Sequence, residues 1–406
     1  MDEAKAFKVD RKVRISSHLA DQAVRQRRAG LTLVELLVVV GIILLLLTII
    51  VPRVQPGIED QRLREAARSL NVFLAAARVR ALESGQPVGV AFQRLAEQPN
   101  ACRVVYQIQL PPPYAGETLD ARVCVAINSA GPTPIVAKVS MGAIADGLVR
   151  PGDRIRFGHQ GPWFVLAPIS SDPTKGNPDS NQNEFIDFDQ GVDANNDGFV
   201  DNLLLHVTAA AEGAPLPALP WPTFPNFGPP VPFLIQRMPN LDNTGFGGSM
   251  LRSSVPPLQL PDQVVIDLGA SGIGAAGRHF AVQAPSAPPV LLIFSPTGSL
   301  EEAYLGGDLP ANPFRRAILT EPIFFLVGSW ERMPVDVASG VSPAEDGLLN
   351  WQDARNFWVA INPQNGLTTV AQVYADTVGP GGVSVPADLA RSRQMARETQ
   401  IAMGGR

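Results

Sequence analysis

The chain has 406 residues, a formal net charge of −5 and a charged fraction of only 17%, and this length allows one large or two modest domains with a sizeable core. An acidic chain lacks the excess of Lys and Arg that non-specific phosphate binding needs, so it is a poor candidate for non-specific nucleic-acid binding. The 38 prolines and 36 glycines favour a β-rich, loop-rich architecture outside any long helix.

The N-terminus combines a basic leader, residues 1–30, with a long apolar run. The run covers residues 31–51 and has three polar interruptions, Thr32, Glu35 and Thr48. About 20 apolar residues in a helix cross the hydrocarbon core of a bilayer, and flanking basic residues stay cytoplasmic. Residues 31–52 are therefore predicted to form a single-pass membrane helix with a cytoplasmic N-terminus. A carboxylate is costly in such a helix, so Glu35 is a functional candidate.

This stretch resembles the signal of type IV prepilins and pseudopilins, which has a basic leader, a glycine and a glutamate five residues later. The resemblance implies that a prepilin peptidase cleaves between Gly30 and Leu31 and methylates the new amino group. It also implies that Glu35 meets the Leu31 amine of a neighbouring subunit, and that Pro52 kinks the helix. An ordinary signal peptide does not fit, because its apolar region is shorter and its cleavage site follows that region.

Residues 53–84 carry a helical pattern that continues the membrane helix. The apolar positions recur at spacings of three and four, which is the period of one helix face, at Leu63, Ala67, Leu70, Leu74, Ala77 and Ala81. Gly85 and Pro87 end the pattern. The sequence predicts one long helix with a membrane half and an amphipathic half.

The rest of the chain resembles the GspH/FimT group of minor pseudopilins. The resemblance rests on the helix end and on strand-and-turn segments at 260–266, 292–299 and 357–367. It implies an α+β, pilin-like fold in which the long helix packs on an antiparallel β-rich head, residues 85–378. The chain is longer than members of that group, so residues 128–258 are predicted to be a large insertion, with a second excursion near 300–350.

Two segments outside this pattern are rich in proline or polar residues. The 214–232 run is Pro-rich, which excludes regular helix or central strand and predicts a linker or an arm covering the head. A partner-docking arm is the alternative. Residues 379–406 form a polar C-terminal tail, predicted to be a frayed terminal helix.

The chain has two cysteines, Cys102 and Cys124. They lie in strand-like runs at 101–110 and 121–127, separated by a turn-rich segment that a hairpin would close. An exported protein meets oxidising conditions, so a disulfide between them is expected. Two buried free thiols are the alternative.

The predicted insertion contains two Asp/Asn-rich loops with oxygen side chains at alternate positions. The candidate ligands are Asp179, Asn181, Asn183 and Asp187 in the first loop and Asp193, Asn195, Asp197 and Asp201 in the second. This spacing is typical of Ca²⁺ loops, and Gly198 adds the turn glycine, although Leu204 stands where an EF-hand has glutamate. A structural Ca²⁺ that pins an insertion with little core of its own is expected. A solvated Asx turn is the alternative.

No set of residues in the sequence points to an enzyme. The four histidines are scattered, and the GxGxxG match at 272–277 lacks a βαβ context. The sequence therefore predicts a structural minor pilin or pseudopilin of a type IV pilus or a type II secretion pseudopilus. By resemblance its partners are other pilins, prepilin peptidase and an inner-membrane assembly platform, with the head periplasmic or extracellular. A filament-borne or membrane-anchored binding module that recognises an exported substrate or surface is the alternative.

Overall fold

The structure is a computed structural model. It describes residues 32–128, 135–145, 148–150, 152–159, 162–167, 186, 199–207, 220–237, 253–282, 287–309, 312–334, 342–375 and 386–403. Within these ranges the side chains at 47–56, 200–207, 306–309, 312–316, 318 and 386–387 are not described. The chain divides into two compact units, Met1–Ile58 and Glu59–Arg406.

The first element, α1, is a helix over Leu33–Ser84 and so belongs to both units. In the second unit its buried positions are those that the three- and four-residue spacing predicts. These residues are at most 4% exposed: Leu63, Ala67, Leu70, Leu74, Ala77 and Ala81. The helix ends where the sequence predicts, because Gly85 adopts φ +63° and its N–H donates to the Ala81 carbonyl.

The head of the second unit is built on an antiparallel sheet, which makes the architecture α+β. Ten described strands form it: β1 (Val88–Arg94), β2 (Ala101–Gln109), β9 (Leu258–Gln259), β10 (Val264–Ile273), β11 (Val290–Phe294), β12 (Leu300–Leu309), β13 (Asn312–Ile318), β14 (Ile323–Ser329), β15 (Phe357–Ile361) and β16 (Thr368–Gln372). Their order is β13-β12-β11-β1-β2-β10-β14-β15-β16, with β9 against β2. Strands β10, β11 and β15 arise at the segments that the sequence singles out.

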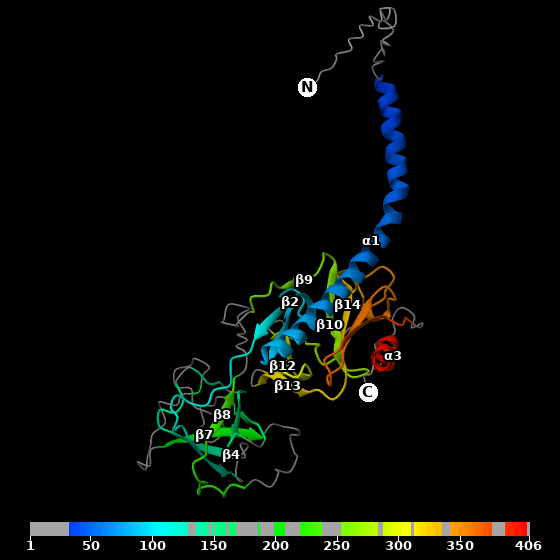
Figure 1. The fold of residues 1–406 in the computed structure, drawn as a ribbon. Coiled ribbons are helices and arrows are strands. Elements are labelled where there is room, and N and C mark those ends of the chain that lie inside the picture. Colours follow the sequence, from blue (N-terminus) through cyan, green and yellow to red (C-terminus); the bar gives the residue numbers. More distant parts are fainter. Residues whose placement is uncertain are drawn as a thin grey trace, which may run out of the picture. The chain divides into compact units, whose positions relative to one another are not determined.

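The two faces of this sheet pack against different helices. Successive strand residues point to opposite faces, so neighbours in sequence join different hydrophobic clusters. Phe325 joins the core under α1, together with Leu70, while the adjacent Phe324 joins a second cluster with Trp358. That second cluster also includes Leu389 and Ala396 of the two C-terminal helices. Figure 1 shows the second half of α1 along the head sheet, and the C-terminal helix α3 (Gln394–Ala402, red) beside the orange part of that sheet.

The C-terminal segment packs on the head and is not a frayed tail, which corrects the prediction. It forms α2 (Pro386–Ser392) and α3 (Gln394–Ala402), joined at the fully buried Arg393. The Arg393 guanidinium donates to the carbonyls of Ala270, Gly274 and Gly277 at 2.6–2.9 Å and stacks on the Trp358 ring. Burial lowers its pKa to about 9, so it remains charged at neutral pH. Backbone dipoles thus replace water around this cation.

The predicted insertion folds as a second antiparallel sheet with its own core. Its strands are β3 (Val123–Ile127), β4 (Ile135–Ser140), β5 (Arg154–Phe157), β6 (Phe164–Leu166), β7 (Phe199–Val207) and β8 (Phe233–Gln236), in the order β3-β4-β7-β6-β5-β8. The two edges meet, because Val231 pairs with Val123 and Tyr114 pairs with Ile235 through backbone hydrogen bonds. The sheet therefore closes into a barrel. We call residues 114–237 the barrel lobe.

The barrel lobe corrects two expectations about the insertion. It begins before residue 128, because β3 and Tyr114 belong to it. It also has a substantial core, since alternate residues of its strands gather inside with Phe164 and Phe233 at 1% exposure. The described part of the Pro-rich run lies along the edge of β3, where Ile127 N–H donates to the Pro222 carbonyl. This arm thus supplies β3 with backbone partners beyond the Val123–Val231 pair, which leaves less of the strand open to another chain.

Cys102 and Cys124 do not form the expected disulfide with one another, and both are buried thiols. Cys102 lies on β2 of the head sheet and Cys124 on β3 of the barrel lobe. The two strands do not form the expected hairpin, since β2 pairs with β1 and β3 pairs with β4. Burial raises the pKa of the Cys102 thiol to about 12, which keeps it protonated.

We expect the buried stripe of α1 to determine the stability of the head. Leu70→Ala should lower the free energy of unfolding by about 2–5 kcal/mol, because it leaves a cavity at a fully buried site. The measurement is urea unfolding of the detergent-solubilised full chain, followed by tryptophan fluorescence. Val72→Ala, two residues away and 66% exposed, is the control and should change it by less than about 0.5 kcal/mol. Equal effects of the two substitutions would contradict the packing.

Candidate functional site

The candidate site lies at the start of α1, beside the predicted cleavage point. Thr32 precedes the helix and caps it, because its hydroxyl accepts a hydrogen bond from the Glu35 N–H at 3.3 Å. The first helical hydrogen bond runs from the Leu36 N–H to the Thr32 carbonyl at 3.0 Å. Thr at the cap with Glu three residues later is the capping-box sequence. The predicted processing residues Gly30 and Leu31 precede this cap and lie outside the described residues.

Glu35 lies in the first turn of α1, where the partial positive charge of a helix N-terminus favours a carboxylate. The residue is exposed, and among the described residues it has no ion-pair partner. The Glu35 carboxylate is therefore accessible to a cation from outside the described residues. Pro52 lies within α1, and its side chain is outside the description.

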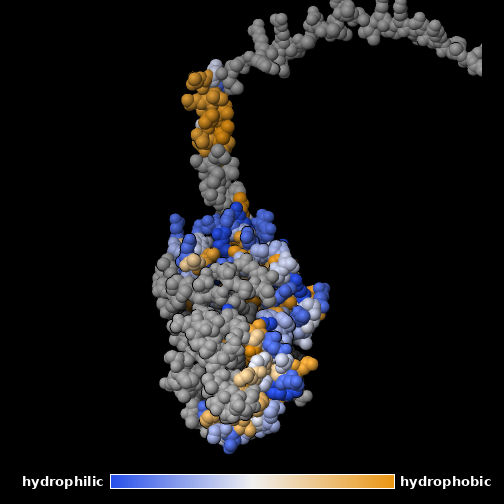
Figure 2. Space-filling view, turned by 90° about the vertical axis from the view of Figure 1, so that its left-hand side faces the viewer, coloured by the Kyte–Doolittle hydropathy of each residue, from blue (hydrophilic) through white to orange (hydrophobic). Residues whose placement is uncertain are grey.

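The helix around Glu35 exposes apolar side chains on every side. Twelve large apolar residues are between 44% and 77% exposed: Leu33, Val34, Leu36, Leu37, Val38, Val39, Val40, Ile42, Ile43, Leu44, Leu45 and Leu46. Figure 2 shows this part of α1 as continuous hydrophobic surface. Over the residues whose side chains are described, no helix reaches the length and apolarity that a membrane crossing requires. The predicted membrane helix, residues 31–52, includes positions outside that description.

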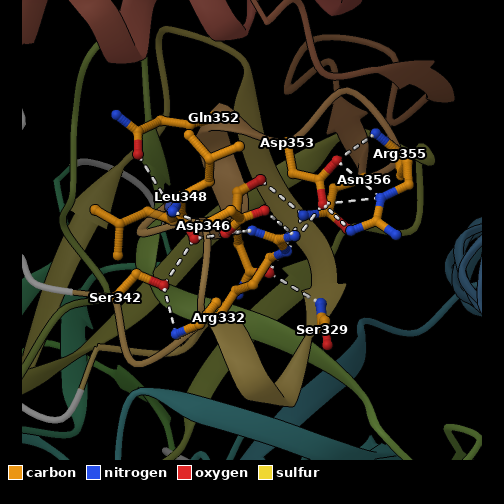
Figure 3. Close-up of polar contacts among 12 residues, drawn as sticks. Ser329, Arg332, Ser342, Asp346, Leu348, Gln352, Asp353, Arg355 and Asn356 are labelled. Atoms are coloured by element: carbon orange, nitrogen blue, oxygen red, sulfur yellow. Dashed lines mark hydrogen bonds and ion pairs between the residues drawn. The ribbon is translucent and has the colours of Figure 1, made fainter. Parts of the chain in front are cut away.

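A second group of charged residues lies in the head, where Arg332 joins two carboxylates. It binds Asp346 through two hydrogen bonds of 2.7 Å and Asp353 at 2.9 Å (Figure 3). Asp353 also accepts hydrogen bonds from Arg355, which lies 3.8 Å from Glu59 of α1. The hydrogen bonds from Arg332 lower the pKa of Asp346 to about 2.

This network is structural. Its two arginines each pair with carboxylates, and its described members include no nucleophile and no histidine. It ties the segment before β15 to the beginning of α1 in the second unit. The segment also includes η2 (Asn350–Gln352), while Arg332 belongs to η1 (Trp330–Arg332). Sequence reasoning missed the network, because its members are spread over a stretch that shows no periodic pattern.

The predicted calcium ligands fall largely outside the described residues, namely Asp179, Asn181, Asn183, Asp187, Asp193, Asn195 and Asp197. Asp201 lies on β7 without a described side chain. Two described residues show where the loops join the barrel lobe. Ile186 is 1% exposed within the barrel core, and β7 begins at Phe199. Elsewhere in the described ranges, no three His, Cys, Asp or Glu residues gather in a way that would hold a metal.

The comparison with protein families decides between a pilin-like signal and an ordinary anchor. The family described as the prokaryotic N-terminal methylation motif matches residues 25–51. The motif is that of a type IV pilin-like precursor. It implies processing by a prepilin peptidase, assembly with other pilins and a membrane-anchored N-terminus. It covers Gly30, Leu31 and Glu35. Comparison with curated proteins and with solved structures gave no match.

Proposed function

We propose that the chain is a structural minor pilin or pseudopilin of a type IV pilus or a type II secretion pseudopilus. The observation that supports this most is the change along α1 in how its apolar side chains are exposed. One continuous helix exposes apolar residues on all sides in the first unit and buries a single face in the second. A helix that is apolar all round needs a membrane or other helices around it. A subunit that moves from a membrane into a helical bundle meets both requirements.

Assembly in this proposal depends on one charge pair. Cleavage after Gly30 leaves a cationic, methylated amine on Leu31, directly before the Thr32 cap. The positive end of the helix dipole disfavours this amine in its own subunit and favours Glu35 one turn later. In an apolar bundle each charge is costly alone, so the Glu35 carboxylate and the Leu31 amine of a neighbouring subunit offset one another.

The proposal places the head outside the cytoplasm, periplasmic or in a filament, with an inner-membrane assembly platform as a partner. The antiparallel head sheet packed on α1 supports a pilin-like fold. Strands β10, β11 and β15 follow the helix in the order that the GspH/FimT resemblance implies. The assignment to a minor component rests on that resemblance.

A second candidate function is a binding module carried by the filament. The barrel lobe favours it, because this lobe interrupts the head between β2 and β9 and has a separate core. The head sheet and α1 form a complete α+β unit without it. A closed barrel on such a carrier is a suitable site for recognising an exported substrate or a surface.

We further propose that the two Asp/Asn-rich loops bind Ca²⁺. The reason differs from the one expected from sequence, since the barrel lobe has a core of its own. Ile186, inside the first loop, is buried in the barrel core, and Phe199, directly after the second, begins β7, so the barrel lobe holds the chain at both places. Oxygen side chains at alternate positions, as in these two loops, are the ligands that Ca²⁺ takes.

Replacing Glu35 by Gln should reduce incorporation into filaments at least about tenfold, because the Leu31 amine then loses its partner at a cost above about 1.4 kcal/mol. The measurement is the amount of the chain in a sheared filament fraction from cells with a pilus or pseudopilus machine. Cleavage after Gly30 should persist in this variant. Glu83→Gln, an exposed glutamate of α1 in the second unit, is the control and should incorporate normally. Undiminished incorporation of Glu35→Gln would contradict the pairing.

Addition of millimolar Ca²⁺ should raise the unfolding temperature of the full chain, because a ligand that binds only the folded state stabilises it. Asp193→Asn combined with Asp197→Asn should abolish this rise, whereas Asp120→Asn, an exposed residue of the barrel lobe, should preserve it. The readout is circular dichroism during heating. An unfolding temperature that does not respond to Ca²⁺ would refute the calcium proposal.

A further inference from the structure

The barrel lobe and the rest of the second unit have separate apolar cores. The predicted head, residues 85–378, includes the barrel lobe; we use the name head here for residues 59–110 and 253–403 alone. Among described residues, two hydrophobic clusters consist of barrel-lobe residues and four consist of head residues, with none drawn from both. Within the described residues, each core therefore packs without members of the other. The contacts that join the lobe to the head include polar ones.

One such contact is a buried ion pair. Arg154 on β5 of the barrel lobe places its Nη2 2.6 Å from the Glu302 Oε1 on β12 of the head. The two side chains are only 5% and 2% exposed. Charges this deeply buried are rare unless paired. We call these two residues the docking pair.

Each member of the docking pair is oriented by its own lobe. Tyr304, on the same strand as Glu302, donates its hydroxyl to the Glu302 Oε2 at 2.8 Å. Arg154 donates to the Gln236 Oε1 at 2.8 Å and lies 5.4 Å from the centre of the Trp163 ring. The two halves of the contact are therefore positioned within their lobes, which suits a contact that forms when folded lobes meet.

The consequence of breaking the pair depends on whether its members belong to one core or to two. In a single core, loss of one partner leaves an uncompensated buried charge, and the core loses stability. Between two lobes with separate cores, separation hydrates the remaining charge and leaves both cores intact. Because each member of the docking pair is positioned within its own lobe, we expect separation of the lobes with both cores intact.

We propose that Arg154 and Glu302 hold the barrel lobe against the head, and that loss of this pair releases the lobe as an intact folded module. The connection after β2 runs through three consecutive prolines, residues 111–113, which are stiff and extended. The released lobe would stay joined to the head through these prolines and through residues 238–252. This inference does not depend on the proposed function, because it concerns the second unit alone.

The test measures the distance between the lobe and the head in the full chain. Nitroxide labels are placed at Leu119→Cys in the barrel lobe and at Glu83→Cys on α1, both exposed positions. Pulsed electron resonance then gives the distribution of distances between the labels. The wild-type chain, whose two cysteines are buried, controls for background labelling.

With the docking pair intact we expect one narrow distribution. Glu302→Gln and, independently, Arg154→Gln should broaden it and shift it to longer distances, while the urea midpoint of the chain stays near the wild-type value. Glu301→Gln, an exposed neighbour on β12, is the matched control and should leave the distribution narrow. A narrow, unchanged distribution in both docking-pair variants would overturn the proposal. A large fall of the urea midpoint with an unchanged distance distribution would also overturn it. That result would show that the lobe stays docked although the remaining charge of the pair is buried and unpaired.

Discussion

The structure depends on one helix that must satisfy two environments. Up to residue 46, the described side chains of α1 are exposed on all sides and almost entirely apolar. In the second unit the same helix buries a single stripe, where Ala66, Ala67, Ala77 and Ala81 allow the head sheet to approach closely. Arg78 adds a polar tie, since its Nε donates to the Asn365 carbonyl at 2.8 Å and to that of Gly298. The head sheet is thus organised around a helix that also anchors the chain.

The features that the sequence predicts well are those carried by neighbouring residues. The stripe on α1, its end at Gly85 and the candidate site around Glu35 all follow from spacings of a few residues. The methylation motif is local in the same sense, which is why a family match of residues 25–51 agrees with it. Strand segments beside a proline or glycine turn were also found, although their partners were not.

The features that the sequence does not predict depend on pairing between distant residues. Strand β3 looks like a hairpin partner of β2, yet its backbone pairs with β4, and the expected disulfide fails for that reason. A charged residue such as Arg393 makes the C-terminal segment look solvent-exposed in the sequence. In the structure the Arg393 guanidinium is buried against three carbonyls of β10 and the following turn. The Arg332 network and the docking pair likewise join residues that no local pattern connects.

The N-terminus of the mature chain distinguishes a processed pilin-like precursor from an ordinary anchored or secreted protein. The measurement is mass spectrometry of the chain after co-expression with a prepilin peptidase, with a Gly30→Val variant as the uncut reference. We expect the wild-type chain to begin at methylated Leu31 and the variant to keep residues 1–30. A wild-type chain that retains residues 1–30, or one that is cut beyond Val51, would contradict the pilin-like interpretation and the role given to Glu35.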